Sequence, residues 1–265
     1  MNTTSPTVGG LLREWRTRRR MSQLDLAVGA EISQRHLSFL ESGRAQPSRE
    51  MVMHLAEHLA IPLRERNALL LAAGYAPTYR ERPLSDPDLE AARAAVELVL
   101  AAHEPFPALA VDRHWSLVLA NRAAQHFMTG IDASLLTPPI NVLRIGLHPQ
   151  GMGPRVANYR EWRRHVLERL QRQVDVSGDP VLAELMQELK SYPEPEGSTD
   201  PVATPAPDFA GVAVPMRLKT PAGVLSFLST TTVFGTPVDI TLSELAIETF
   251  LPADVTTAQA LRAMT

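Results

Sequence analysis

The sequence predicts two domains of different class: an all-α, five-helix domain over residues 1–80 and an α+β domain with a small antiparallel sheet over residues 88–265. Three observations lead to this prediction. Short amphipathic segments with capping residues fill the first part, strand-like runs occur only in the second, and a proline-rich stretch from 75 to 87 separates the two. The length of 265 residues accommodates two domains of ordinary size.

The five helices of the first domain are expected between residues 8 and 75. Val8, Leu11, Leu12 and Trp15 follow the i, i+3, i+4, i+7 spacing of one helix face. The other boundaries rest on residues that favour helix ends: the N-cap serines Ser22, Ser33 and Ser48, Pro62 at the start of the fifth helix, and Gly29, Gly43 and Gly74 at helix ends.

The second domain is expected to mix helices and strands. Helices are predicted over 88–103, from Asn121 onward, over 154–174 and over 180–190; strands are predicted over 108–112, 115–120, 212–218, 224–229 and 231–238. Thr241, with Glu244 three residues later, has the spacing of a capping box and predicts a closing helix. Residues 192–208 carry five prolines and few apolar side chains, which indicates a surface loop.

Charge is distributed unevenly between the two parts. Residues 1–80 hold eleven basic and seven acidic side chains, a net charge of +4, on a chain whose overall charge is −3. A basic front part on an acidic chain indicates a polyanionic partner for that part alone. The absence of cysteine excludes disulfides and thiolate chemistry, and neither a signal peptide nor an apolar run of membrane-spanning length is found, so a cytoplasmic protein without membrane contact is expected.

Residues 21–48 have the pattern of a helix-turn-helix. The apolar residues Leu26, Ala27, Ile32, Leu37 and Leu40 occupy the positions where two short helices must pack together. The second helix then presents Gln34, Arg35, Ser38 and Phe39 outward. Gln bonds the N6 and N7 edge of adenine and Arg bonds O6 and N7 of guanine, so this helix is suited to reading bases in a major groove about 12 Å wide.

This stretch resembles the lambda-repressor-like, or xenobiotic-response-element, helix-turn-helix family. The resemblance rests on Ser22-Gln23, on Leu37-x-x-Leu40-Glu41-x-Gly43 and on Pro47-Ser48. It implies that Gln23 faces the DNA backbone, that Gln34, Arg35 and Phe39 face bases, and that Ser42, Arg44 and Arg49 contact phosphates of a double-stranded operator. The full candidate set for DNA contact is Ser22, Gln23, Ser33, Gln34, Arg35, Ser38, Phe39, Ser42, Arg44 and Arg49.

Two further expectations follow from the same resemblance. An ion pair between Arg16 and Glu41 should join the first helix to the third. The turn departs from the family pattern, because Glu31 stands where glycine is usual and Gly29 lies two residues earlier.

The rest of the chain resembles regulators that carry an MmyB-like, PAS-like ligand-binding domain. The resemblance rests on PALAVDRHWSLVLANRAA at 107–124 and TPVDITLSELAIETFLPADVTTAQALR at 236–262. It implies a lipophilic, fatty-acid-like ligand, no catalytic residues and no cofactor. Candidate ligand-binding residues are the strand positions Leu109, Val111, Leu117 and Leu119, the aromatic residues Trp115, Phe127, Tyr159, Trp162 and Phe227, Val166, and Arg144 or His148 as an anchor for a polar head. The aromatic residues fit a filled core as well as a lined pocket.

One motif is set aside. His54, Glu57 and His58 spell the H-x-x-E-H of a metalloprotease class, but they lie on a helix whose apolar face packs inside the five-helix domain. No metal site is expected there.

Three functions remain open at this point. The chain is a ligand-responsive DNA-binding regulator, a constitutive regulator whose second domain only dimerises, or an enzyme with a DNA-binding head. The second domain shows no nucleophile–base set or metal cluster, which disfavours the enzyme. A homodimer is expected in the first two cases, because one short recognition helix reads few base pairs and two half-sites about 34–36 Å apart restore specificity.

Overall fold

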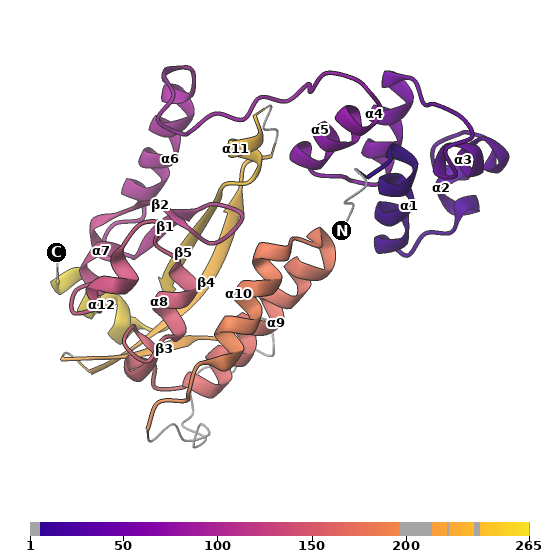
Figure 1. The fold of residues 1–265 in the computed structure, drawn as a ribbon. Coiled ribbons are helices and arrows are strands. Elements are labelled where there is room, and N and C mark those ends of the chain that lie inside the picture. Colours follow the sequence, from indigo (N-terminus) through magenta and orange to yellow (C-terminus); the bar gives the residue numbers. More distant parts are fainter. Residues whose placement is uncertain (1–5, 197–213, 222, 236–238, 265) are drawn as a thin grey trace. The chain divides into compact units, whose positions relative to one another are not determined.

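A computed structural model gives the fold and describes residues 6–196, 214–221, 223–235 and 239–264 (Figure 1). The chain divides into two compact units. The first comprises Met1–Pro83 together with Thr236–Ser243, and the second comprises Leu84–Gly235 together with Glu244–Thr265. The sequence prediction had placed the 236–243 segment in the second domain.

Five α-helices build the first unit, as predicted: α1 Val8–Arg18, α2 Gln23–Gly29, α3 Gln34–Glu41, α4 Arg49–His58 and α5 Leu63–Ala72. Ser22, Ser33 and Ser48 cap α2, α3 and α4 through their side chains. At Ser22 the capping box is complete, because the Asp25 carboxylate also accepts from the Ser22 backbone N–H. The serines that predicted the helix starts therefore form the capping hydrogen bonds that favour serine at these positions.

The five helices also end in the same way. The residue after each C-cap has a left-handed φ: Arg20 at 56°, Glu31 at 52°, Gly43 at 74°, Ala60 at 47° and Gly74 at 84°. The next residue then donates its N–H back across the helix end, as in Met21 to Arg16 and Ile32 to Ala27. Only two of these five positions carry glycine, which adopts this conformation without strain.

The first unit closes around α1 and α3. Leu12, Leu37 and Leu40 are fully buried in one core with residues of α2, α4 and α5. At Gly9 the helices come so close that a Cβ would lie 2.3 Å from the Leu40 carbonyl oxygen. Since that oxygen is backbone, no side-chain rotation can make room for it.

A fully antiparallel, five-stranded sheet forms the centre of the second unit. The strands are β1 Ala108–Val111, β2 Leu117–Ala120, β3 Met216–Thr220, β4 Gly223–Val233 and β5 Ala246–Pro252, in the spatial order β2-β1-β5-β4-β3. The helices around it are α6 Glu90–Ala102, α7 Arg122–Phe127, α8 Val142–Leu147, α9 Tyr159–Ser177, α10 Pro180–Ser191 and α12 Val255–Ala263, with 3-10 turns at Pro87–Leu89, Ala133–Leu136 and Gly153–Arg155.

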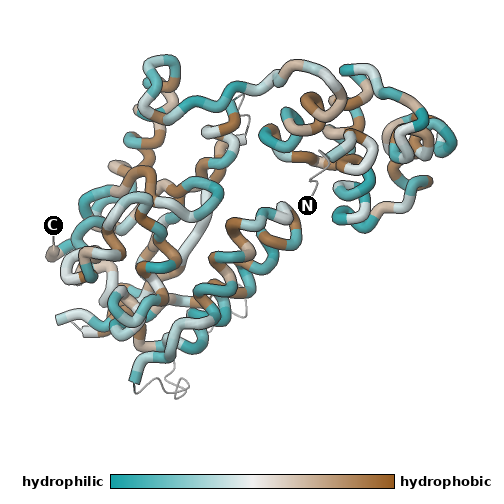
Figure 2. The backbone as a smooth tube through the Cα atoms, in the orientation of Figure 1, coloured by the Kyte–Doolittle hydropathy of each residue, from teal (hydrophilic) through white to brown (hydrophobic). Residues whose placement is uncertain are grey.

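Helices cover both faces of this sheet. On β1, Leu109 and Val111 belong to the large core that contains residues of α9 and α10, whereas Ala108 and Ala110 pack with Val96 of α6. Apolar positions recur along α9 and α10 among hydrophilic ones, which lets each helix bury one face (Figure 2). None of the helices in the described ranges is long and apolar enough to cross a membrane.

Three predicted elements were wrong in detail. The closing helix does not begin at Thr241: only the short helix α11 Ile240–Ser243 forms there, β5 follows it as an inner strand, and the chain closes with α12 instead. Thr241 does not cap a helix, because its hydroxyl donates to the Arg82 carbonyl instead. β4 runs unbroken where two strands were expected, since it pairs continuously with β5. The long helix begins at Tyr159, after a 3-10 turn that includes Pro154. Most of the predicted 192–208 loop lies outside the described residues.

The residues around α11 attach to the linker that ends the first unit. The Asp239 carboxylate is completely buried and accepts from Arg82 Nε at 3.0 Å and from the Thr241 backbone N–H at 2.9 Å. The Ile240 N–H donates to the Arg80 carbonyl at 2.9 Å. A buried carboxylate needs such partners to be tolerated, so this attachment is specific rather than incidental.

Candidate functional site

The outward face of α3 carries the side chains predicted to read DNA. Leu37 and Leu40 are fully buried beneath it. Gln34 and Arg35 are exposed, and Phe39 is half-buried beside them. One face of the helix thus holds it in the core, while the other leaves amide and guanidinium groups free to meet base edges.

Phe39 lies between two arginines. The Arg35 guanidinium carbon is 5.3 Å from the centre of the Phe39 ring, and that of Arg44 is 5.9 Å from it. Both distances are within the range of a cation–π contact, which at an exposed site contributes roughly 0.5–1 kcal/mol. The ring therefore restrains both cations before any DNA is bound.

The other candidate DNA contacts are placed differently. Gln23 donates to the Glu41 carboxylate at 2.8 Å, and Arg49 donates to the Thr78 hydroxyl at 2.7 Å, so both already have protein partners. Four of the remaining candidates are exposed: Ser22, Ser33, Ser42 and Arg44. The last one, Ser38, is half-buried.

The predicted Arg16–Glu41 ion pair is present. Arg16 donates to both carboxylate oxygens, from Nε at 2.6 Å and from Nη2 at 2.9 Å. Burial acts to raise the pKa of Glu41, but the hydrogen bonds from Arg16 and Gln23 outweigh it and hold that pKa below its ordinary value. The pair joins α1 to the end of α3 and so fixes the orientation of the reading helix.

His54 and His58 of the H-x-x-E-H motif serve the packing of the first unit. The His54 Nε2 atom lies 2.8 Å from the Ala30 carbonyl oxygen, and the two rings meet edge to face at 4.7 Å. Within the described residues, no group of three or more histidine, cysteine or acidic side chains is arranged to hold a metal ion.

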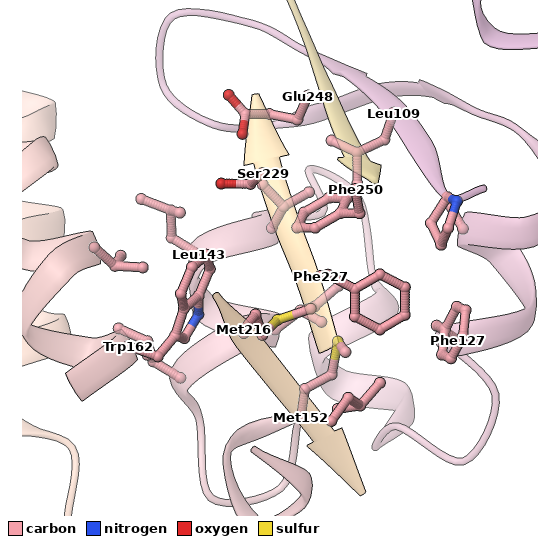
Figure 3. Close-up of a pocket in the computed structure, with 18 of the residues that line it drawn as sticks. Leu109, Phe127, Leu143, Met152, Trp162, Met216, Phe227, Ser229, Glu248 and Phe250 are labelled. Carbon is pink, nitrogen blue, oxygen red and sulfur yellow. The ribbon is translucent and has the colours of Figure 1, made fainter. Parts of the chain in front are cut away.

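An apolar cavity of about 110 Å³ lies within the second unit (Figure 3). Its walls come from β1, β3, β4 and β5 of the sheet and from α7, α8 and α9. Almost every described lining side chain is aliphatic, aromatic or thioether, and the charged or hydroxyl-bearing ones are Arg169, Ser229 and Glu248. The labelled examples in Figure 3 are Leu109, Phe127, Leu143, Met152, Trp162, Met216, Phe227, Ser229, Glu248 and Phe250.

Half of the predicted ligand-binding residues line this cavity, namely Leu109, Trp115, Phe127, Trp162, Val166 and Phe227. Val111, Leu117 and Tyr159 pack in the surrounding core instead. Leu119 packs on the opposite face, toward α6. The register explains this: Val111 pairs with Leu117 but Ala110 pairs with Leu119, so Val118 is an extra residue and the side-chain alternation reverses there.

The two predicted polar anchors are not among the cavity residues. Arg144 binds Glu188 on α10 through Nε at 2.8 Å and Nη2 at 2.7 Å. The His148 ring lies against Tyr192 at 4.8 Å. Contact with Glu188 and burial together raise the pKa of Tyr192, so this phenol stays protonated. These groups form a separate polar cluster that ties α8 to α10.

The polar end of the cavity was missed by the sequence analysis. Arg169 of α9 bonds the Glu248 carboxylate of β5 through both Nη atoms, with one contact at 3.1 Å. Its guanidinium also donates to the Thr231 hydroxyl and lies 4.5 Å from the centre of the Trp115 indole. Glu248 escaped notice because its segment was predicted as a helix; an acid within an otherwise buried apolar run was the signal available.

Comparisons with known proteins identify a family for each of the two parts of the chain. Residues 92–264 match the model of the MmyB-like transcription regulator ligand-binding domain, and residues 12–66 match a helix-turn-helix model. No curated protein matches. A structure described as an RNA-binding light-oxygen-voltage receptor is 15% identical with a TM-score of 0.25; the match covers 99% of this chain and 64% of that one, and it is too weak to inform the fold. The chain therefore belongs to the MmyB-like family and is a DNA-binding transcription regulator with a ligand-binding domain.

Proposed function

We propose that this regulator binds operator DNA as a homodimer through α3 and responds to a lipophilic, fatty-acid-like ligand held in the cavity. The observation that carries the proposal is the cavity itself, which is lined almost wholly by carbon and sulfur atoms. Water gains few hydrogen bonds in such a space, whereas an alkyl chain gains contacts on every side.

The size of the cavity makes an occupant favourable. At about 24 cal/mol per Å³, a void of this size costs the folded protein roughly 3 kcal/mol in lost transfer and packing energy. A ligand that fills the space would offset this cost, which supports a cavity that serves to hold one.

Chain connectivity supports a response in DNA binding rather than dimerisation alone. Ser229 on β4 and Glu248 on β5 both line the cavity. The segment that joins these two strands contains Asp239 and Thr241, which attach to Arg82 at the end of the first unit. A ligand that shifts β4 against β5 would therefore act directly on residues that belong to the DNA-binding unit.

The proposal of a homodimer rests on the number of base pairs that the protein must contact to recognise an operator. α3 is eight residues long, and such a helix contacts few base pairs. Two copies on half-sites one helical turn apart would supply the specificity that a regulator needs. Light scattering of the full chain with and without operator DNA tests this, and a monomer under both conditions at micromolar concentration would contradict it.

A melting series tests the cavity's role. Saturated fatty acids of increasing length should raise the melting temperature of the full chain, because a ligand that binds only the folded state stabilises it by mass action. Gly146 offers a matched pair of variants: it lines the cavity on α8, and a Cβ there meets no heavy atom within 4 Å. Gly146→Leu should fill part of the cavity and abolish the shift, while Gly146→Ala adds helix propensity alone and should keep it.

The outcomes separate the three functions. If no chain length shifts either Gly146→Ala or the unaltered protein, the ligand-responsive proposal fails and dimerisation remains. If the bound fatty acid is recovered chemically altered after incubation, the protein is an enzyme. Recovery of the unaltered acid with a shift confined to proteins with an open cavity supports a sensor.

A further inference from the structure

We infer that the polar end of the cavity selects a long-chain ligand with an uncharged hydroxyl head, such as a primary alcohol, over the corresponding carboxylate. This inference rests on the proposed function, since it assumes that the cavity takes a lipophilic chain. It concerns the three lining residues that are not apolar: Arg169, Ser229 and Glu248.

Arg169, the one basic side chain among the described cavity residues, is already neutralised. Arg169 bonds Glu248 through both Nη atoms, and the Thr231 hydroxyl closes the group by donating to Glu248 at 2.6 Å. The Glu248 side chain is only 4% exposed, so this carboxylate stays beside the guanidinium rather than turning to solvent. Among the described residues that line the cavity, no second basic side chain is present to take its place.

An entering carboxylate would meet a pair of opposite charges whose fields largely cancel. It would leave water, which is costly for an ion, and would gain attraction to Arg169 only with repulsion from Glu248 a few ångströms away. Displacing Glu248 from Arg169 would instead leave a buried carboxylate without its partner. A hydroxyl head avoids both penalties, because it carries no charge.

Ser229 supplies a partner for such a head. Its side chain lines the cavity from β4, and Figure 3 shows its hydroxyl at the same end of the close-up as the Glu248 carboxylate. Within the described part of the chain, this hydroxyl has no hydrogen-bond partner, whereas the neighbouring Thr230 and Thr231 hydroxyls are both bonded. Ser229 can both donate to and accept from an alcohol, and it lies where the apolar walls end.

Calorimetric titration of the full chain with a matched pair of probes tests the inference. Dodecan-1-ol and dodecanoic acid have the same chain length and differ in the head group; both are used below their aggregation concentrations at neutral pH. The alcohol should bind at least about tenfold more tightly, because the acid pays for the desolvation of its charge. Dodecylamine should also bind more weakly than the alcohol, since the cancelling pair favours neither sign of charge.

Two variants assign the preference to named residues. Ser229→Ala leaves the ion pair intact. It should lower the affinity for the alcohol about fivefold, the effect of one hydrogen bond, and change the affinity for the acid little. Glu248→Gln removes the negative charge beside Arg169, so it should invert the order and favour the acid. Melting curves establish that each variant is folded; if Glu248→Gln does not fold, the unaltered protein and Ser229→Ala still decide the question.

The results distinguish this inference from the proposed function. Tighter binding of the acid by the unaltered protein would overturn the head-group inference but leave a lipid-binding cavity in place. Binding of neither probe, together with the absence of any melting shift along the fatty-acid series, would overturn both. Equal binding of acid and alcohol would also contradict the inference, because it would show that the polar end does not discriminate between a charged and an uncharged head group.

Discussion

The candidate DNA-reading surface and the cavity are built in opposite ways from the same chain. The surface comes from one continuous stretch, Gln34 to Arg44, in which neighbours in sequence are neighbours in space. The cavity gathers residues from Pro107 to Phe250 across four strands and three helices. A site formed by one stretch of chain can be predicted from the spacing of its residues. A site formed by several elements depends on which strands pair and on which face of the sheet each side chain lies.

The two regions differ in how function relates to stability. Arg35 projects from α3, whose buried face with Leu37 and Leu40 holds the fold, and Arg44 lies just beyond the end of this helix. At the cavity the same side chains do both tasks: Phe227 and Trp162 are buried core residues and also line the space. Substitutions should therefore separate function from folding at the surface far more cleanly than at the cavity.

The largest expected effect tests whether the first unit depends on its own close packing. Gly9→Ala should destabilise it by about 3 kcal/mol, because the new Cβ would meet the Leu40 backbone oxygen and the two helices must part. Gly10→Ala is the matched control, since its Cβ comes only within 3.2 Å of a movable Thr7 hydroxyl.

Thermal melting of both variants measures this difference. Equal melting temperatures for Gly9→Ala and Gly10→Ala would show that α1 and α3 do not approach as the structure has them. The cavity's response to fatty acids should survive in Gly9→Ala, because its residues all lie in the second unit.

The next effect concerns readout. Arg35→Ala should cost roughly 1–3 kcal/mol on the cognate operator and relax specificity at one base position, because a bidentate base contact is lost. Arg44→Ala should weaken binding to all DNA sequences alike. It should also reduce the slope of log affinity against log salt concentration by about one. Affinities of both variants for operator and random DNA over a salt series measure the contrast.

If Arg35→Ala loses the same factor of affinity for operator and for random DNA, the assignment of α3 as the base-reading helix is wrong. Phe39→Leu sharpens the test. It removes the ring that restrains both arginines and should weaken operator binding by less than Arg35→Ala does.

The smallest effect distinguishes helix ends that carry glycine from those that do not. Glu31 adopts a φ of 52°, so Glu31→Gly should stabilise the first unit by up to about 1 kcal/mol through relief of strain. Gly43→Ala places a Cβ at a φ of 74° and should lose about as much. Denaturant unfolding of the two variants measures both changes, and a gain in stability for Gly43→Ala would contradict the shared geometry of these turns.

Sequence reasoning succeeded where the physics is local. The N-cap serines and the outward face of α3 follow from spacings of three or four residues, whereas the ion pair of Arg16 with Glu41, 25 positions apart, was implied by the family resemblance. It failed at β5, where pairing with β1 and β4 overrides the capping pattern at Thr241. It also failed at Leu119, since one extra residue in a strand reverses every side chain beyond it.

Local pattern could have marked Glu248 at the polar end of the cavity, but not the residue that pairs with it. Arg169 and Glu248 are 79 positions apart and meet only because the fold packs α9 in the same core as the sheet. Arg144 lies on a helix beside the cavity and was a reasonable anchor by chemistry, but Glu188 occupies it. A single charged residue in a sequence does not reveal which opposite charge will reach it.

The central claim is that the occupant of the cavity changes what α3 does on DNA. The direct measurement is the affinity of the full chain for an operator selected from random DNA, with and without a saturating amount of the fatty acid or alcohol that shifts its melting most. The unaltered protein should change its affinity at least about fivefold, the lower range of allosteric coupling, and Gly146→Leu should not respond. An unchanged affinity in the unaltered protein, with the ligand shown by melting to be bound, would contradict the account.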